Sequence, residues 1–116
     1  MTLDADARAR LLRLVGLGLR ARGAVVGVER VREGVKKNKV AFAIVAADAS
    51  RNSLDKIVPL LNARRVRFIE VPSAAELGGV AGREAAAVVG IVDRQLAKGI
   101  RALMESGPAT DQKEEG

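Results

Sequence analysis

The side chains that most often carry out catalysis are absent from this sequence. Its 116 residues include no histidine and no cysteine, which removes the commonest general base, the thiolate nucleophile and the usual zinc ligands. The acidic residues are scattered and show no spacing typical of a metal site or an acid–base pair. We therefore expect a protein that is not an enzyme and that holds neither a metal ion nor a cofactor.

One glycine cluster invites comparison with a nucleotide-binding loop. Gly16, Gly18 and Gly23 resemble part of a dinucleotide-binding fingerprint, but their spacing differs and they lie within a segment of helical periodicity. The sequence also contains no Gly-x-x-x-x-Gly-Lys, the spacing with which a loop and its lysine hold phosphates. Packing between helices at small residues is a sufficient explanation of these glycines.

Basic residues are concentrated in the N-terminal half of the chain. Lys and Arg total 20 against 14 Asp and Glu, so the net charge is +6. Residues 8–67 hold 15 basic and 4 acidic side chains, an excess of eleven, whereas residues 68–104 hold four of each. This distribution predicts a polyanionic partner, with RNA or DNA ahead of an anionic membrane surface. The alternative is an ordinary solvated surface. Phe42 and Phe68 are the only aromatic residues, so we do not expect bases to stack on aromatic side chains.

The elements that must position these charges follow from the spacing of the apolar residues. Some segments repeat with helical periodicity, and others are apolar without alternation, the pattern of strands covered on both faces. Their alternation predicts an α/β/α sandwich around one small sheet. The expected helices cover residues 4–22, 27–37, 52–61 and 93–104, with a short helix after Ser73, and the expected strands cover residues 24–26, 40–46, 66–71 and 85–92.

Polar residues mark where the expected helices begin. Asn52, with Asp55 three residues later, has the spacing of a helix cap, and Ser73 with Glu76 has the spacing of a capping box. Asp93 stands directly before the last helix and is expected to cap it. These assignments explain several carboxylates as structural.

Proline and glycine are expected to disturb two helices. Pro59 lies inside the third helical pattern, where proline removes a hydrogen bond and costs about 3 kcal/mol, so we expect a kink or local loosening. Gly78, Gly79 and Gly82 are expected to loosen the end of the fourth helix into a loop.

The chain is expected to form one domain over residues 1–105, followed by a flexible polar tail over residues 106–116. No apolar run approaches the ~18–20 residues that span a bilayer, and the acidic N-terminus is unlike a secretory signal. We therefore expect a soluble, cytoplasmic protein that does not associate with membranes.

Three segments resemble a known family. Residues 57–61 (Ile-Val-Pro-Leu-Leu), residues 71–78 (Val-Pro-Ser-Ala-Ala-Glu-Leu-Gly) with Gly82, and residues 40–50 resemble the kink-turn RNA-binding family of large-subunit ribosomal proteins seven-Ae and thirty-e. The match covers about residues 10–104 and looks most like the family's bacterial YlxQ branch. The resemblance implies a three-layer α/β/α sandwich with a mixed four-stranded sheet, a helix that tolerates Pro59, and a non-enzymatic RNA-binding protein of ribosomal type.

Two segments are candidates for the RNA surface. A helix that begins at Gly27 offers backbone N–H groups to phosphates or base edges, and Arg30 and Lys37 lie two turns apart on one face. The resemblance implies that this helix start and the Gly82 loop lie on one surface. The candidate RNA-binding residues are Gly27, Val28, Glu29, Arg30, Glu33, Lys37, Gly82, Arg83, Glu84 and Ala85.

The helix start departs from the pattern of the family that it resembles. That family carries Gly-x-Asn-Glu-x-x-Lys at this place, followed one turn later by a basic residue. Here Gly27 keeps the glycine and Lys37 the later basic position, while Glu29, Arg30 and Glu33 replace the Asn, Glu and Lys.

The leading hypothesis is a monomer that recognises structured RNA, with ribosomal RNA of kink-turn type as the expected partner. One alternative is a protein-interaction module on the same fold whose RNA surface has decayed, which Glu29 and Glu33 favour. Another is the recognition module of an RNA-modifying enzyme, but 116 residues leave no room for its catalytic domain. Binding to structured RNA at two salt concentrations separates the first two classes.

Overall fold

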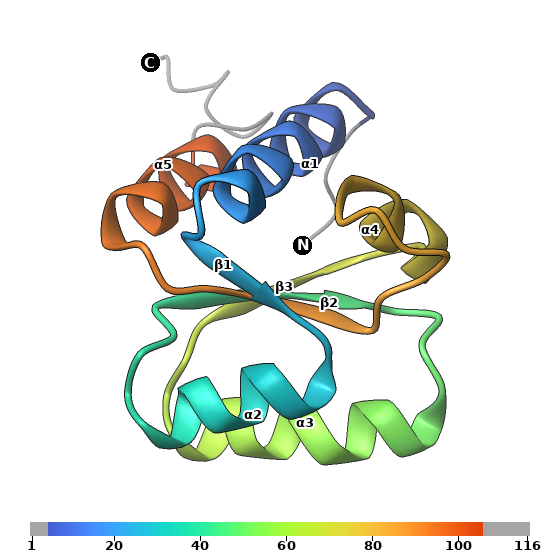
Figure 1. The fold of residues 1–116 in the computed structure, drawn as a ribbon, viewed down its shortest axis with the longest axis vertical. Coiled ribbons are helices and arrows are strands. Elements are labelled where there is room, and N and C mark those ends of the chain that lie inside the picture. Colours follow the sequence, from blue (N-terminus) through green and yellow to red (C-terminus); the bar gives the residue numbers. More distant parts are fainter. Residues whose placement is uncertain (1–4, 106–116) are drawn as a thin grey trace, which may run out of the picture.

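Four strands form one mixed sheet between two layers of helices (Figure 1). A computed structural model describes residues 5–105 of the chain. The strand order is β1-β4-β2-β3, with β2 parallel to β3 and β4 antiparallel to both β1 and β2. This arrangement confirms the predicted α/β/α sandwich. The elements are α1 Ala5–Arg20, β1 Ala24–Val26, α2 Val28–Lys36, β2 Phe42–Ala46, α3 Arg51–Ala63, β3 Phe68–Val71, α4 Ala74–Val80, β4 Val88–Ile91 and α5 Arg94–Glu105.

Two clusters of buried side chains hold the three layers together. Every residue of β2 is buried, and its side chains alternate between the two faces of the sheet. Phe42 and Ile44 join the cluster beneath α1, α4 and α5, while Ala43 and Val45 join the cluster above α2 and α3. The apolar run that predicts a strand covered on both sides therefore belongs to a central strand.

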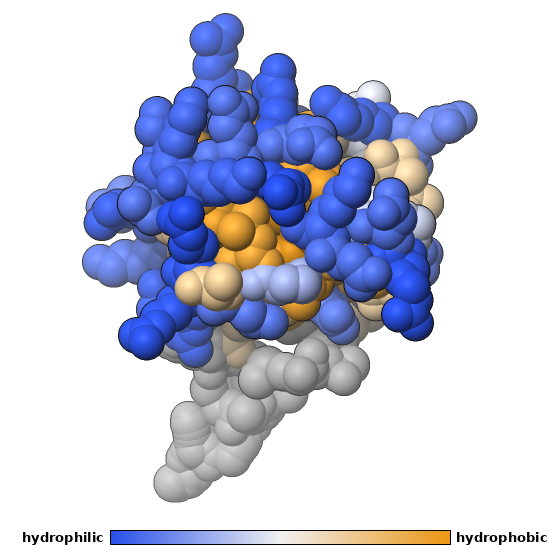
Figure 2. Space-filling view, turned by 90° about the horizontal axis from the view of Figure 1, so that it is seen from below, coloured by the Kyte–Doolittle hydropathy of each residue, from blue (hydrophilic) through white to orange (hydrophobic). Residues whose placement is uncertain are grey.

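The outer face of α2 and α3 is mostly hydrophilic, with a small apolar area near its middle (Figure 2). Partly buried apolar side chains of these helices, Val28, Leu54 and Val58, pack against the cluster beneath them. Two guanidinium groups tie the helices together, because Arg32 Nη1 donates to the carbonyl of Lys56 at 2.6 Å and Arg64 Nη1 donates to the carbonyl of Lys36 at 3.4 Å.

One of the three predicted helix caps is wrong. Ser50, not Asn52, caps α3, since Ser50 Oγ accepts from the N–H of Ser53 at 3.1 Å and Asn52 lies inside the first turn. Ser73 Oγ accepts from the N–H of Glu76 at 3.1 Å, as predicted. The predicted cap by Asp93 is also present, because its Oδ1 accepts from the first turn of α5 at 2.8 and 3.1 Å.

The loosening expected at Gly78 and Gly79 is wrong, whereas the kink expected at Pro59 stays a prediction, since Pro59 does not end its helix. α3 continues for four residues beyond Pro59, whose ring lies on the exposed side of the helix. α4 continues through Gly78 and Gly79 to Val80, and Gly82 lies beyond it with φ +74°. Gly78 is buried, which indicates a packing role instead of a loosened helix end.

Residues 5–105 all belong to this sheet, its helices and their connections. The tail expected at residues 106–116 lies outside the residues that the structure describes. Within the described part of the chain, no helix has both the length and the apolar character needed to cross a bilayer.

The central strand generates a test of this packing. Ile44→Ala removes a side chain that has no exposed surface, so we expect the free energy of unfolding in urea to fall by about 2–5 kcal/mol. Leu17→Ala is the control, because Leu17 is 49% exposed and its truncation should change stability by no more than about 0.5 kcal/mol. Equal effects of the two substitutions would contradict the placement of Ile44 in the core.

Candidate nucleic-acid interface

The start of α2 is fixed by a glycine that no other residue replaces easily. Gly27 joins β1 to α2 with φ 104° and ψ 151°, a left-handed conformation that side chains with a Cβ rarely adopt. Its N–H donates to the carbonyl of Val88 at 3.0 Å, which ties the junction to β4. No side chain caps α2, so the N–H groups of its first turn remain available to a ligand.

The second candidate segment, the loop between α4 and β4, lies directly against α4. The N–H of Arg83 donates to the carbonyl of Gly78 at 2.9 Å, and the N–H of Ala86 donates to the carbonyl of Ala74 at 2.9 Å. A Cβ built on Gly78 would lie 2.5 Å from Cα of Ala85. The loop can therefore reach this position only because residue 78 has no side chain.

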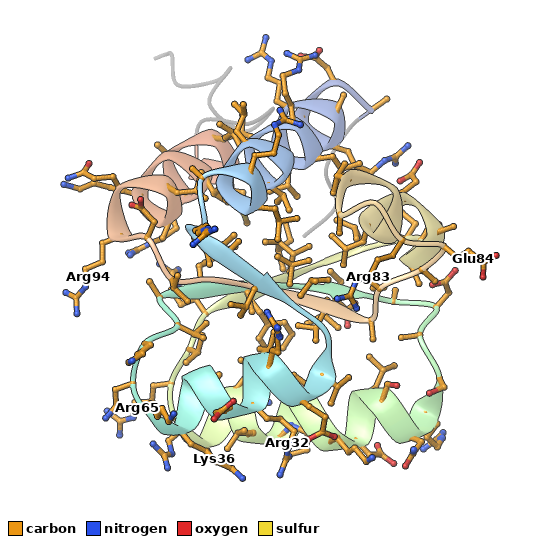
Figure 3. The ribbon with its side chains drawn as sticks, in the orientation of Figure 1. Arg32, Lys36, Arg65, Arg83, Glu84 and Arg94 are labelled. Atoms are coloured by element: carbon orange, nitrogen blue, oxygen red, sulfur yellow. The ribbon has the colours of Figure 1, made fainter. Side chains whose placement is uncertain are left out.

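The structure brings the helix start and the loop together. β1 pairs antiparallel with β4, so the end of β1 lies beside the start of β4, where the loop ends. A Cβ built on Gly27 would lie 3.8 Å from the Arg83 guanidinium. Arg83 lies beside the start of α2, whereas Glu84 points away from the molecule (Figure 3). Gly27 from the helix start and Arg83 from the loop are thus predicted site residues of the two segments that lie close to each other.

The remaining predicted residues near this junction differ in exposure. Val28 is half-buried against the cluster beneath α2, which limits what it can offer a ligand. Glu29 and Arg30 are exposed on the first turn of α2, and Glu84 and Ala85 are exposed in the loop, as is Gly82.

Two predicted residues lie farther along α2 and are paired with each other. Lys37 Nζ lies 3.2 Å from a Glu33 carboxylate oxygen, one turn earlier on the helix. Lys37 ends the helix, about 15 Å along its axis from Gly27. Arg30, Glu33 and Lys37 nevertheless line one groove of about 430 Å³ beside Val25 of β1, so a ligand at the junction could extend along it.

The charges at the junction are nearly balanced. Arg30 and Arg83 bring two positive groups, and Glu29 and Glu84 bring two negative ones. Among residues 5–105, no three acidic side chains gather in a way that could hold a metal ion. The arrangement offers guanidinium donors, backbone N–H donors and carboxylate acceptors, the set that reads the polar edges of nucleic-acid bases.

Sequence reasoning missed the residue that holds the loop in place. Gly78 has no chemical group that would contact a ligand, and the sequence does not show that Ala85 will pack against it. The sequence signal that could have identified this residue is the pair Gly78 and Gly79. Glycine is unfavourable inside a helix, so its presence there indicates that another segment approaches closely.

The sequence matches the family described as ribosomal protein L7Ae/L30e/S12e/Gadd45 over residues 9–100. Two proteins named RNA-binding protein YlxQ are similar to this chain. The protein from Bacillus subtilis (strain 168) is 32% identical over 92 residues, which cover 79% of this chain and 92% of the relative. The protein from Enterococcus faecium is 32% identical over 98 residues, which cover 84% of this chain and 94% of the relative.

Solved structures share the fold. A protein of unknown function from Bacillus halodurans matches with a TM-score of 0.75 and 27% identity, covering 84% of this chain and 98% of its own. The 15.5 kD RNA-binding protein of Giardia lamblia matches with the same TM-score and 20% identity, covering 91% of each chain. The arrangement of helices and sheet is thus common to proteins of low sequence identity.

The contact between α4 and the loop generates a matched pair of substitutions. Gly78→Ala places a methyl group against the backbone of Ala85, so we expect a loss of about 1–3 kcal/mol in the free energy of unfolding. Gly79→Ala is the control, since a Cβ there meets nothing within 4 Å and alanine favours the helix by about 0.5–1 kcal/mol. A stabilised Gly78→Ala variant would contradict the close approach. Urea unfolding measures both.

Proposed function

Because this chain belongs to the ribosomal protein L7Ae/L30e/S12e/Gadd45 family, we propose that it is a non-enzymatic RNA-binding protein that recognises structured RNA of kink-turn type. The names of its relatives from Bacillus subtilis and Enterococcus faecium support RNA as the partner. We further propose that the partner is ribosomal RNA in the cytoplasm and that the protein is a monomer before it binds.

The observation that carries this proposal is the approach of Arg83 to Gly27. It places a guanidinium group from the α4–β4 loop beside the uncapped start of α2, although Arg83 and Gly27 are 56 positions apart in the sequence. A guanidinium group can donate two hydrogen bonds to a phosphate or to a guanine edge, and the N–H groups of the helix start can bind a further phosphate. The two segments would hold an RNA bend between them.

The carboxylates on α2 have a role in the same proposal. Glu29 is exposed beside the helix start, where it can accept hydrogen bonds from the amino groups of guanine or cytosine. Glu33 instead pairs with Lys37 and cancels a charge that would otherwise attract phosphate. The surface is therefore suited to the shape and edges of an RNA loop more than to its charge.

The deciding experiment compares two RNA stems of equal length. One contains a kink-turn internal loop and the other is fully paired, and the dissociation constant of each is measured at about 0.1 M and about 0.3 M salt. We expect the kink-turn stem to bind at least about tenfold tighter at both concentrations, a difference of about 1.4 kcal/mol. Equal affinity would contradict kink-turn recognition, and no binding to either stem would favour the protein-interaction module.

The two arginines at the junction should contribute to that preference. Arg83→Ala and Arg30→Ala each remove a positive group from the proposed surface, so we expect each to weaken kink-turn binding by about 1–2 kcal/mol. Arg13→Ala on α1 removes the same charge from an exposed position outside both segments and should have little effect. If all three substitutions weakened binding equally, attraction by diffuse charge would replace the localised site.

Removal of the ion pair between Glu33 and Lys37 on α2 should raise the affinity for RNA. Glu33→Lys removes the partner of Lys37 and adds a positive charge to the groove beside β1, so kink-turn RNA should bind tighter by about 1 kcal/mol. Glu70→Lys is the control, because it makes the same charge change at an exposed position on strand β3, away from α2. Filter binding measures both, and an equal gain from both variants would show that net charge alone is responsible.

A further inference from the structure

The connections between the elements meet at two opposite ends of the sheet. β2 and β3 start at the same end, where antiparallel β4 finishes and β1 begins, because Ile91 pairs with both Ala24 and Phe42. The connections 21–23, 37–41, 64–67 and 92–93 therefore lie at one end. The Gly27 junction and the connections 47–50, 72–73 and 81–87 lie at the other.

The two ends differ strongly in charge. The four connections opposite the Gly27 junction contain six basic side chains and one carboxylate. The connections on the junction side contain one basic side chain and two carboxylates. Figure 3 shows this separation, with Lys36, Arg65 and Arg94 at one end and Arg83 and Glu84 at the other.

Five of the six basic side chains in these connections form no ion pair with a carboxylate of the described residues; the exception is Lys37, which pairs with Glu33. In residues 5–105, ion pairs are formed by Arg8, Arg10 and Lys37, and none involves another basic residue of these connections. The one carboxylate here belongs to Asp93, which is occupied by the first turn of α5. The charges therefore face solvent with their attraction for an anion intact.

A broad groove continues this surface onto α5. It has a volume of about 830 Å³ and lies between the α2–β2 connection and the start of α5. Its charged lining residues are all basic: Lys39, Arg94, Lys98 and Arg101. A groove with four cations and no carboxylate suits a polyanion.

The backbone shows that charge is retained here at a conformational cost. The described non-glycine residues with positive φ are Arg22 (63°), Asn38 (59°) and Arg65 (59°), and each follows the C-terminus of a helix at this end. Glycine usually occupies such positions because it adopts this conformation without strain. Arginine at two of them keeps a guanidinium at the tip of the molecule where glycine would be more stable.

Stabilisation of helix dipoles does not account for this many charges. The C-termini of α1, α2 and α3 lie at this end, and each carries about half a negative charge. Arg64, which donates to the carbonyl of Lys36, serves that purpose for α2. The N-terminus of α5 lies at the same end with the opposite dipole, yet it begins with Arg94.

We propose that this basic end is a second RNA-binding surface, which takes the phosphates of an RNA duplex. Its principal residues are Arg22, Lys39, Arg65, Arg67, Arg94 and Lys98. Double-stranded RNA is recognised mainly through its backbone and shape, which requires positive charge and no base-reading groups. The inference extends the proposed function, since a bent RNA at the Gly27 junction and a duplex at the basic end would be held by one protein. It does not require kink-turn recognition.

The test uses a blunt RNA duplex of about 16 base pairs without internal loops, a length that a duplex-binding module can span. The full chain, the variant Lys39→Gln/Arg65→Gln and the control Arg13→Gln/Lys56→Gln are compared, and both variants lose two positive charges. A plot of log K against log salt has a negative slope, and we expect that slope to become less steep by about one to two units in the first variant. The control should keep the slope of the full chain. Equal slopes in the two variants, or no duplex binding by the full chain, would overturn the proposal.

Two further measurements separate this surface from folding and from the Gly27 site. Arg65→Gly relieves the backbone strain of a non-glycine residue with positive φ, so it should preserve or raise the melting temperature. The same substitution removes a positive charge and should weaken duplex binding about threefold. Unchanged duplex affinity in that variant would overturn the role of Arg65. Arg83→Ala should leave duplex binding unchanged. Failure of kink-turn recognition would appear only in the comparison of the two stems.

Discussion

Both proposed RNA surfaces depend on the position of β4 between β1 and β2. The first residue of β4 accepts the N–H of Gly27 and so brings the α4–β4 loop to the start of α2. The last residue, Ile91, pairs with Ala24 and Phe42 and so brings α5 to the connections before β1 and β2. One buried strand thus sets the neighbours at each end of the molecule, and both ends consist of segments far apart in the sequence.

The order and type of the elements could be predicted from the sequence, and the details that depend on distant contacts could not. The apolar run around Ile44 identifies a central strand because both of its faces must be covered. The packing role of Gly78 could not be predicted, because its neighbour Ala85 approaches it only after the chain has turned back through the α4–β4 loop. The sequence predicts Asn52 as the cap of α3, but the observed cap is Ser50, because its hydroxyl accepts a hydrogen bond from the N–H of Ser53 in the first turn.

The candidate site was predicted in part, for a similar reason. The resemblance to the family implies that the helix start and the loop lie on one surface. The approach of Arg83 to Gly27 agrees with that expectation. The pairing of Glu33 with Lys37 was readable from their spacing of four residues on a helix. The separation of charge between the two ends could not be predicted from a count of charges along the chain, because the strand order decides which connections lie at the same end. In the function that we propose, a nearly neutral surface would read RNA shape and a basic end would hold phosphates, so that specificity and affinity would come from different ends of the molecule.

The proposed RNA site spans the start of α2 and the α4–β4 loop. An NMR titration of the full chain with a kink-turn stem, at about 0.3 M salt to weaken diffuse phosphate contacts, follows every backbone amide at once. We expect the largest changes in amide chemical shift at residues 27–30 and 82–85. Changes confined to α1 and α5, or spread evenly over all exposed basic residues, would contradict it.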